Sequence, residues 1–303
     1  MTGPALVTHD LAKRYHAKWA LQSCDLTVPR GCMAALIGPN GAGKTTLLQL
    51  AAGLIRPTSG QISVLGDAPN QKPAWLAQVG FLAQEVPLYR RLSGEQLLGM
   101  GAHLNPSWDM RIARDRLEAL EIPLDKAVSE LSGGERAQVG LALSLGKRPR
   151  ILLLDEPVAS LDPLARRDFL TSLAEAQMES ELTVLLSSHL VADIERVCDF
   201  LVLLSKSRVQ LVGRIDELLA AHRWLTGPRR KSEATMAGHE IVSESHTERQ
   251  TTLMVRLSGP VHDPTWDVSD VGLEELVLAY MGRRSQLASH VPQGRLSIVE
   301  GHL

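Results

Sequence analysis

Short apolar runs that end at glycine, proline or polar residues recur along the chain and alternate with helical patterns. The run at residues 151–154, Ile-Leu-Leu-Leu, is apolar on both faces, which is typical of a central strand in a parallel sheet. Such a strand needs helices on both sides, so the pattern predicts an α/β fold. The other predicted strands are residues 5–10, 21–28, 33–37, 61–65, 79–83 and 183–186, with a turn expected at residues 13–16 between the first two. Helices are predicted at residues 47–54 and 164–180.

A helical block interrupts this alternation. Residues 92–145 show helical patterns at 95–104, at 110–120 and from about Ser132 onward, with no strand-like run between them. We therefore expect an inserted helical subdomain over about residues 86–148.

The chain is predicted to divide near residue 222. Residues 200–204 and 208–212 form a predicted closing hairpin, and the polar, Gly- and Pro-containing stretch 223–239 indicates a linker. These features predict a first domain, residues 1–222, and a small C-terminal extension, residues 240–303. Within the extension, weak strand patterns occur at 240–243 and 252–257, a short helix is expected at 273–281, and residues 283–303 are expected to be loosely held.

Charge and cysteine content narrow the class of protein. The 303 residues carry a formal net charge of −2, so there is no basic excess that would suggest nucleic acid as a partner. Cys24, Cys32 and Cys198 have neither metal-ligand spacing nor an even-numbered framework, which favours a reducing cytosol. No signal-like segment or membrane-spanning run occurs, so we expect a cytoplasmic protein. If it works at a membrane, something else must hold it there.

The stretch GPNGAGKTT, residues 38–46, carries the clearest chemistry. It fits the pattern G-x-x-x-x-G-K-[ST], and it lies between a predicted strand and a predicted helix, as this motif requires. Glycines let successive backbone N–H groups point at phosphate oxygens, and a helix N-terminus adds partial positive charge. A chance glycine-rich turn is the alternative, but four fixed positions and the flanking order agree with a phosphate loop. Its nucleotide-binding residues are Gly38, Pro39, Asn40, Gly41, Ala42, Gly43, Lys44, Thr45 and Thr46.

Three residues in or before this loop have individual expected roles. Lys44 would reach the β- and γ-phosphates of ATP, and the Thr45 hydroxyl would be a ligand of Mg²⁺. Tyr15, upstream of the loop, could stack its ring on a nucleotide base. A partly buried surface tyrosine is the competing interpretation of Tyr15.

Two carboxylates, Asp155 and Glu156, follow the buried run at 151–154 directly. Ligands in parallel sheets bind beyond the carboxyl ends of the strands. Asp155 is therefore predicted to hold Mg²⁺, and Glu156 to accept a proton from an attacking water. An exposed acidic turn is the weaker interpretation, because adjacent carboxylates after a buried strand are costly without a cation.

Two further polar residues end predicted strands. His189 follows residues 183–186 and could hydrogen-bond a γ-phosphate or the attacking water, although a lone histidine is more often an ordinary polar residue. Gln84 follows residues 79–83, and its amide oxygen could reach Mg²⁺ or a water. Taken alone, Gln84 is an unremarkable boundary residue.

The helix expected near residue 132 opens with LSGGE. Ser132 and Glu135 fit a capping box, which explains this helix start in structural terms alone. The capping box leaves Gly133 and Gly134 unexplained, because two glycines are poor helix formers. Their presence indicates close approach of a ligand to the backbone, and a phosphate at a helix N-terminus would be such a ligand.

The motifs GPNGAGKTT, Gln84, LSGGE, ILLLDEP, SLD and His189 occur in one order between residues 5 and 219. This ordered set resembles the nucleotide-binding subunit of ATP-binding cassette (ABC) transporters, and LSGGE separates that family from other P-loop proteins. The segment at residues 276–281 resembles tails of bacterial ABC-2-type export subunits, which favours export.

The resemblance implies a P-loop NTPase core with a mixed, largely parallel sheet and an N-terminal antiparallel β subdomain. Tyr15 would stack on the base, and Gln84 would couple Mg²⁺ and water to the permease contact. Glu135 stands where the family most often has glutamine, and its charge could weaken binding of the partner's nucleotide. The implied catalytic residues are Glu156, His189 and Gln84, the magnesium residues are Thr45, Gln84 and Asp155, and the residues contacting ATP on a second subunit are Ser132, Gly133, Gly134 and Asp162.

If the LSGGE helix start serves another subunit's nucleotide, two chains must sandwich two ATP molecules, and ATP-driven closure would act on separate transmembrane permease subunits. We therefore expect a dimer peripheral to the inner face of the cell membrane, and both a homodimer and a heterodimer fit. Two alternatives are a soluble ABC-type ATPase acting on ribosomes or DNA and a regulatory protein that binds ATP without useful turnover. A single motif set without long coiled coils argues against the first, and Glu156 with His189 against the second.

Overall fold

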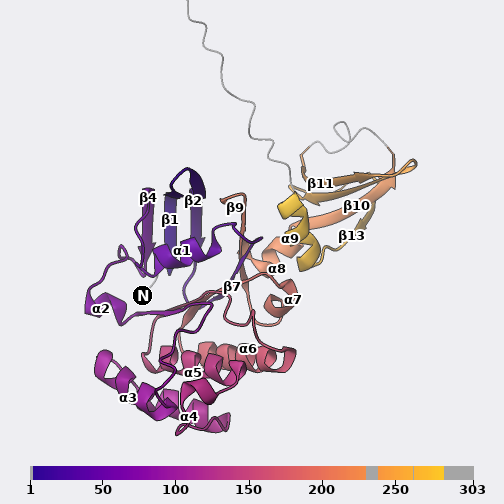
Figure 1. The fold of residues 1–303 in the computed structure, drawn as a ribbon. Coiled ribbons are helices and arrows are strands. Elements are labelled where there is room, and N and C mark those ends of the chain that lie inside the picture. The colour runs from indigo at the N-terminus through magenta and orange to yellow at the C-terminus, as the bar shows by residue number, and fades with distance from the viewer. Residues whose placement is uncertain (1–2, 230–237, 262, 283–303) are drawn as a thin grey trace, which may run out of the picture.

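The computed structural model describes residues 3–229, 238–261 and 263–282. Its centre is a six-stranded sheet with strand order β5-β6-β7-β3-β8-β9 (Figure 1). All neighbouring strands are parallel except β8 and β9, which form an antiparallel hairpin. The strands are β3 (Met33–Ile37), β5 (Val79–Leu82), β6 (Ile151–Leu154), β7 (Thr183–Ser188), β8 (Phe200–Ser205) and β9 (Arg208–Arg214).

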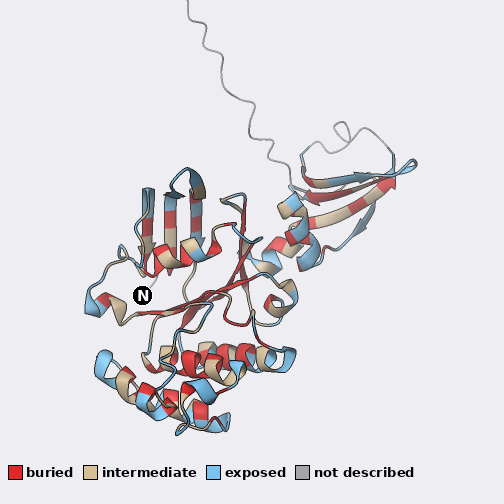
Figure 2. Cartoon of the chain, in the orientation of Figure 1, coloured by how far each residue is buried: buried red, intermediate tan, exposed pale blue. Residues whose placement is uncertain are grey.

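The central strands are buried along their whole length, as Figure 2 shows. One face of the sheet packs against α1 (Lys44–Ala51) and the N-terminal strands, where Leu47 and Leu48 are fully buried. The other face packs against α5 (Gly133–Gly146) and α6 (Pro163–Met178). This layering confirms the predicted α/β fold and explains why the strand sequences are apolar on both faces.

A second sheet, β2-β1-β4, is antiparallel and forms the N-terminal part of the core. Its strands are β1 (Leu6–Tyr15), β2 (Lys18–Val28) and β4 (Ser59–Val64). The turn predicted over residues 13–16 was wrong, because residues 13–15 are still paired and the chain reverses at His16 and Ala17. Polar residues are compatible with a strand there because Arg14 and Tyr15 lie at the exposed end of a hairpin.

The predicted helical block contains α3 (Gly94–Leu104), α4 (Met110–Ala119), a short 3₁₀ turn (Val128–Glu130) and α5. Ser93 and Asp109 cap the first two of these helices with their side chains. Leu97, Leu98 and Leu117 are almost completely buried between the helices. The three helices therefore share a small core beneath the face of the sheet that α5 covers (Figure 1).

The C-terminal part is an antiparallel sheet of order β11-β12-β10-β13, followed by α9 (Leu273–Gly282). The structure differs here from the predicted linker, because residues 223–228 belong to β10 (His222–Pro228), which pairs on both sides. Pairing on both sides and burial of Leu225 and Gly227 on one face, and of His222 on the other, explain this strand despite its polar residues. The other strands are β11 (Glu240–His246), β12 (Gln250–Arg256) and β13 (Asp267–Ser269), and the loose end predicted at residues 283–303 lies outside the described residues.

Helix α9 joins this extension to the central sheet. One apolar cluster contains Leu201 and Leu203 of β8, Met254 of β12, and Leu276 and Val277 of α9. The short helices α7 (Val191–Ile194) and α8 (Ile215–Ala220) complete the contact, and Figure 1 shows the extension projecting from this side of the molecule. The extension and the edge of the central sheet therefore share one core.

Because His222 is buried where the C-terminal extension meets the central sheet, we expect the stability of the protein to depend on pH. Its Nδ1 lies 2.6 Å from Leu218 O and its Nε2 lies 2.9 Å from the hydroxyl of Tyr280 in α9, an arrangement that fits a neutral ring. Burial lowers the pKa of His222 below its ordinary value of 6.5, while the bond to Leu218 opposes that shift. The unfolded chain therefore binds the proton more readily, and stability is lost as pH falls below about 6.5.

We expect acidification from pH 7.5 to 5.5 to lower the wild-type Tm roughly 2–4 °C more than that of His222→Gln. Thermal unfolding of both proteins at each pH measures this difference. His16→Gln is the control, because His16 is exposed and should leave the pH dependence as in the wild type. If the Tm of the wild type and that of His222→Gln fall equally on acidification, protonation of His222 does not cause the loss of stability.

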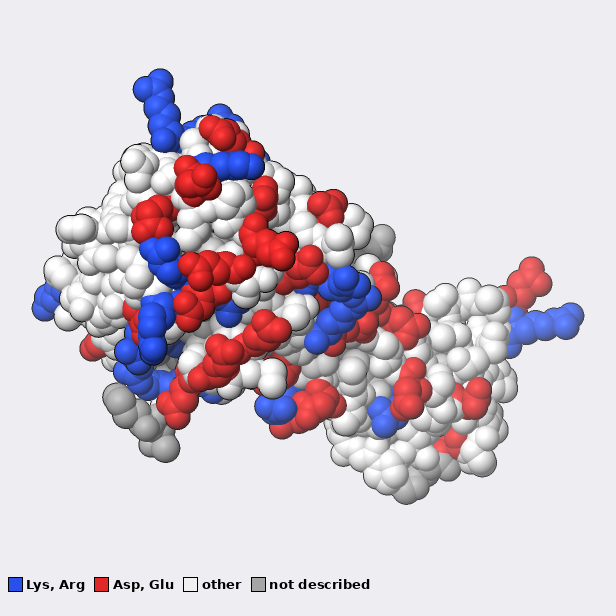
Figure 3. Space-filling view, turned by 90° about the horizontal axis from the view of Figure 1, so that it is seen from below, with Lys and Arg blue, Asp and Glu red and all other residues white. Residues whose placement is uncertain are grey.

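Two surface findings bear on partners. Within the described ranges, no helix is long and apolar enough to cross a membrane. The face seen in Figure 3 carries acidic and basic side chains intermixed, with acidic residues across its middle, and it offers no continuous basic surface.

Candidate nucleotide site

The glycine-rich loop connects β3 to α1 and owes its shape to close backbone contacts. Gly41 and Gly43 have positive φ angles of 78° and 108°. A Cβ atom at Gly43 would collide with the carbonyl oxygen of Ala20 and the side chain of Leu21, and one at Gly38 would collide with the carbonyl oxygen of Leu204. No side chain caps α1 at Gly43, so its first amide groups are available to an anion.

Lys44 begins α1 and is 5% exposed. Its Nζ donates to the carbonyl oxygen of Gly38 at 2.9 Å and lies 3.1 Å from Glu156 Oε1. A buried ammonium needs such partners, because its desolvation is costly. The loop lysine and the carboxylate after β6 are therefore in direct contact, although 112 positions separate them, from 44 to 156.

The register of the central strands gathers the predicted catalytic residues. Leu154 of β6 pairs with Leu186 of β7, so the residues that follow each strand emerge at the same edge. His189 Nδ1 lies 3.3 Å from Glu156 Oε2. Glu156 itself has φ 45°, an unfavourable backbone conformation for a residue with a side chain.

Asp155 is 3% exposed and is held by a residue that sequence reasoning missed. The hydroxyl of Ser187, in β7, donates to Asp155 Oδ1 at 2.9 Å and accepts the backbone N–H of Glu156 at 2.8 Å. The available signal was a hydroxyl residue directly after the predicted strand 183–186, at a position that should be buried.

A pocket of about 470 Å³ lies over the loop and the strand ends. The predicted residues that line it are Tyr15, Asn40, Gly41, Gly43, Lys44, Thr45, Thr46, Gln84 and Glu156. Gly38, Pro39 and Ala42 belong to the loop but do not line the pocket. Asp155, which is buried, and His189, which contacts Glu156, do not line it either. Lys18, Trp19 and Ala20 also line it and were missed, because the turn was placed too early and hid the start of β2.

The donors around this pocket fit a magnesium nucleotide. Thr45 offers a hydroxyl, Gln84 an amide oxygen and Asp155 a carboxylate, and oxygen ligands of these kinds suit Mg²⁺. Tyr15 is 42% exposed at the pocket rim, so its ring is accessible to a base. Within the described ranges, no group of three or more histidine, cysteine and carboxylate side chains could hold a metal ion.

Four predicted residues lie elsewhere. Ser132 caps α5 with the full capping box, its hydroxyl accepting the N–H of Glu135 and its own N–H donating to the Glu135 carboxylate. This N–H bond lowers the pKa of Glu135 below its ordinary value. Asp162 caps α6, and Gly133 and Gly134 face Leu161 and Ala165 next to it. The four residues therefore form one neighbourhood, and none of them lines the pocket around Lys44.

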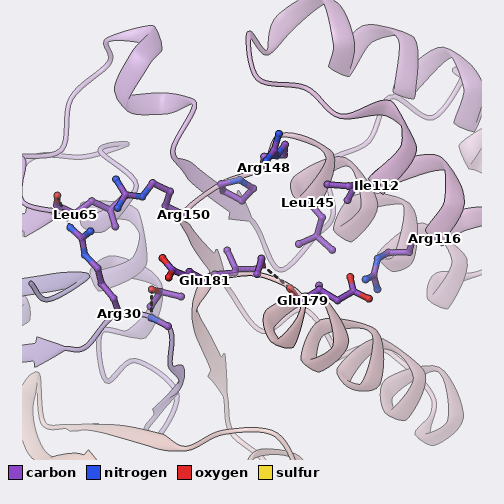
Figure 4. Close-up of a pocket in the computed structure, with 15 residues that line it drawn as sticks. Arg30, Leu65, Ile112, Arg116, Leu145, Arg148, Arg150, Glu179 and Glu181 are labelled. Atoms are coloured by element: carbon purple, nitrogen blue, oxygen red, sulfur yellow. Dashed lines mark hydrogen bonds between the residues drawn. The ribbon is translucent and has the colours of Figure 1, made fainter. Parts of the chain in front are cut away.

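A larger cavity of about 690 Å³ lies at the opposite edge of the sheet, where the parallel strands begin. Figure 4 shows arginines and glutamates from several elements around it. Arg116 in α4 donates to the carbonyl oxygen of Ser172 in α6, which ties the helical block to the core there. The cavity combines charges of both signs and contains no residue of the sequence motifs, so its size does not make it the nucleotide site.

Comparison with known proteins gives consistent results. A family model described as "ABC transporter" matches residues 21–159. The Salmonella typhimurium protein named "Thiamine import ATP-binding protein ThiQ" is 37% identical over 202 residues, which cover 64% of this chain and 85% of that protein.

Two solved structures share the fold, each with a TM-score of 0.63. One, described as "Structure of ATP binding subunit of ABC transporter", is 30% identical and covers 71% of this chain and 92% of its own. The other, described as cbiO1 from Clostridium perfringens, part of the ABC transporter complex cbiONQ, is 28% identical and covers 72% of this chain and 91% of its own.

Proposed function

Because this chain belongs to the ABC transporter family, as an ATP-binding subunit with ATPase activity, we propose that it works in pairs. Two such subunits would bind two ATP molecules at the interface between them. The pair would drive transport through separate membrane-spanning permease subunits. The subunit itself would lie in the cytoplasm, at the inner face of the cell membrane, through its contact with the permease.

The observation that carries this proposal is the separation of two groups of residues within one chain. The pocket around Lys44 contains phosphate-binding residues, whereas the start of α5 and the Asp162 turn lie outside it. The exposed glycine at position 133 leaves backbone N–H groups of a helix N-terminus accessible, which suits a phosphate group. We propose that this second surface binds the nucleotide of the partner subunit, so that each complete site uses two chains.

The hydrolytic step follows from the contacts among Lys44, Glu156 and His189. Phosphate oxygens that bind Lys44 would replace Glu156 Oε1 as its partner, which leaves that carboxylate oxygen able to accept a proton from water. His189, on the other carboxylate oxygen, would hold Glu156 in place or contact the γ-phosphate. Mg²⁺, when bound near Thr45, Gln84 and Asp155, would neutralise phosphate charge.

Import is the direction that the relatives support. The expected export rested on the similarity of residues 276–281 to tails of export subunits, and the curated relatives do not support it, because they are named import proteins. We therefore propose import. Uptake by sealed vesicles containing the complete transporter tests the direction, with thiamine as the first cargo because the relatives' name specifies it.

Gly133→Asp should prevent two subunits from pairing while leaving nucleotide binding intact. An aspartate near the start of α5 is compatible with the helix, but its charge would repel the partner's γ-phosphate. We expect the variant to bind a non-hydrolysable ATP analogue within about twofold of the wild-type affinity and to remain monomeric. Analytical ultracentrifugation with Mg²⁺ and the analogue, beside a nucleotide-binding titration, measures both properties.

Gly99→Asp is the matched control, because Gly99 also has open space around it but lies in α3, away from both surfaces. It should pair as the wild type does. If Gly133→Asp pairs normally, or if the wild type pairs with nucleotide neither with itself nor with a second ATP-binding subunit, the two-chain site is wrong. Co-purification of the wild type with a polytopic membrane protein, rather than with ribosomes or DNA, separates the transport role from the soluble alternative.

A further inference from the structure

We propose that Ser187 is a positioning residue for ATP hydrolysis, because one hydroxyl orients both acidic residues at the end of β6. The inference rests on the roles proposed for Asp155 and Glu156. Ser187 would not touch the nucleotide. It would hold the carboxylate of Asp155, which is assigned to Mg²⁺. It would also hold the backbone of Glu156, whose carboxylate is assigned to proton transfer.

The hydrogen bonds of Ser187 give its hydroxyl a defined direction. The Glu156 N–H occupies a lone pair of Ser187 Oγ at 2.8 Å, and the single hydroxyl proton goes to Asp155 Oδ1 at 2.9 Å. The bond to Oδ1 restricts rotation of the Asp155 carboxyl group and therefore sets the direction of its second oxygen. Partners behind a metal-associated carboxylate commonly tune metal binding in this way.

The same bond supports an unfavourable backbone conformation. Glu156 has φ 45°, and such conformations persist only where the surrounding structure holds them. Its N–H is fixed by Ser187, while its carboxylate reaches Lys44 on one side and His189 on the other. Loss of the serine hydroxyl would leave this N–H without its partner and allow the Glu156 side chain to move away from both residues.

The burial of Ser187 indicates that its hydroxyl is kept for these two hydrogen bonds. Ser187 is 0% exposed and directly follows the apolar residues Leu185 and Leu186 in β7. A hydroxyl at such a position is costly unless its hydrogen bonds are made, so an apolar residue would be the simpler choice for packing alone. The parallel register places Ser187 one position beyond the Leu154–Leu186 pair, directly beside the two acidic residues.

Ser187→Ala tests the proposal, since it removes the hydroxyl and leaves the rest of the strand. We expect kcat for ATP hydrolysis to fall about tenfold or more, while KM for ATP changes less than about twofold. We also expect Mn²⁺, used as a paramagnetic substitute for Mg²⁺, to bind about tenfold more weakly in the presence of a non-hydrolysable ATP analogue. Electron paramagnetic resonance measures this binding without turnover.

The chain offers a matched control in the next residue. Ser188 is also buried in β7, but its hydroxyl bonds to the backbone of Leu190 and not to the acidic pair. Ser188→Ala should keep wild-type kcat and Mn²⁺ affinity. Ser187→Thr retains the hydroxyl and should restore most of both, whereas Ser187→Cys, with a weak donor of similar size, should behave as the alanine variant does.

The outcomes separate this inference from the proposed function. If the wild type hydrolyses ATP and Ser187→Ala matches it in kcat and Mn²⁺ affinity, the positioning role is wrong. An equal loss in Ser188→Ala would also overturn the inference, because the effect would then reflect general damage to β7. Should the alanine variant fail to fold, as circular dichroism would show, the cysteine variant provides the same comparison. A wild type that neither binds nor hydrolyses ATP would instead refute the proposed function.

Discussion

Glu156→Gln should bind ATP with nearly wild-type affinity and hydrolyse it at least about 100-fold more slowly, because general base catalysis contributes about 10²–10⁴-fold. Glutamine preserves the size of the side chain and can still hydrogen-bond Lys44 and His189, but its amide cannot take a proton from water. The binding surface is therefore kept while the proton acceptor is lost. Release of phosphate over time, beside an ATP titration, measures the two properties.

Pairing gives a second readout for this variant. Because hydrolysis would end the clasped state, Glu156→Gln should remain dimeric with ATP and Mg²⁺ for longer than the wild type does. Glu181→Gln is a suitable control, since Glu181 is exposed at the opposite edge of the sheet (Figure 4). Wild-type turnover in Glu156→Gln would remove Glu156 from the role of proton acceptor.

Lys44→Met should lose most of its affinity for ATP. Methionine keeps the apolar stem in its buried site, but it removes the ammonium that would contact phosphate oxygens. One or two charge-assisted hydrogen bonds, each worth about 1.5–3 kcal/mol, correspond to a fall in affinity on the order of 100-fold. Equilibrium binding of a fluorescent ATP analogue with Mg²⁺ measures the change.

Lys18→Met is the matched control for this loss. Lys18 lines the same pocket, but it is exposed at the rim, where water screens its charge. We expect its affinity to change by less than about threefold. If the two variants weaken binding equally, the net positive charge of the pocket matters more than the position of Lys44 in the loop.

The sequence predicts the central architecture well because burial dictates composition there. Residues 151–154 read as a core strand and are one, since strands covered on both faces must be apolar throughout. The meeting of Lys44, Glu156 and His189 at one sheet edge was also predictable, because parallel strands end together.

Exposed and paired segments were harder to predict. Residues 13–15 look like a turn because they are polar, yet pairing with β2 makes them strand. Residues 223–228 look like a linker, yet partners far along the chain, in β12 and β13, pair with them. Local sequence propensity does not reveal a pairing strand that lies far away in the sequence.

The role of Ser187 could not be predicted for a related reason. The sequence marks Ser187 only as a hydroxyl residue after the predicted strand 183–186, and its two partners precede it by 31 and 32 positions. Only the register between β6 and β7 brings the hydroxyl beside Asp155 and Glu156.

The core shared by α9 and the central sheet limits how the protein can be shortened. Cutting at residue 222, the boundary that the sequence suggests, would expose the apolar side chains of Leu201 and Leu203 that α9 and β12 help to cover. Freshly exposed apolar surface of this kind promotes self-association. Preparations of the catalytic part alone would therefore be expected to precipitate, and crystallisation or screening work should retain residues up to Gly282.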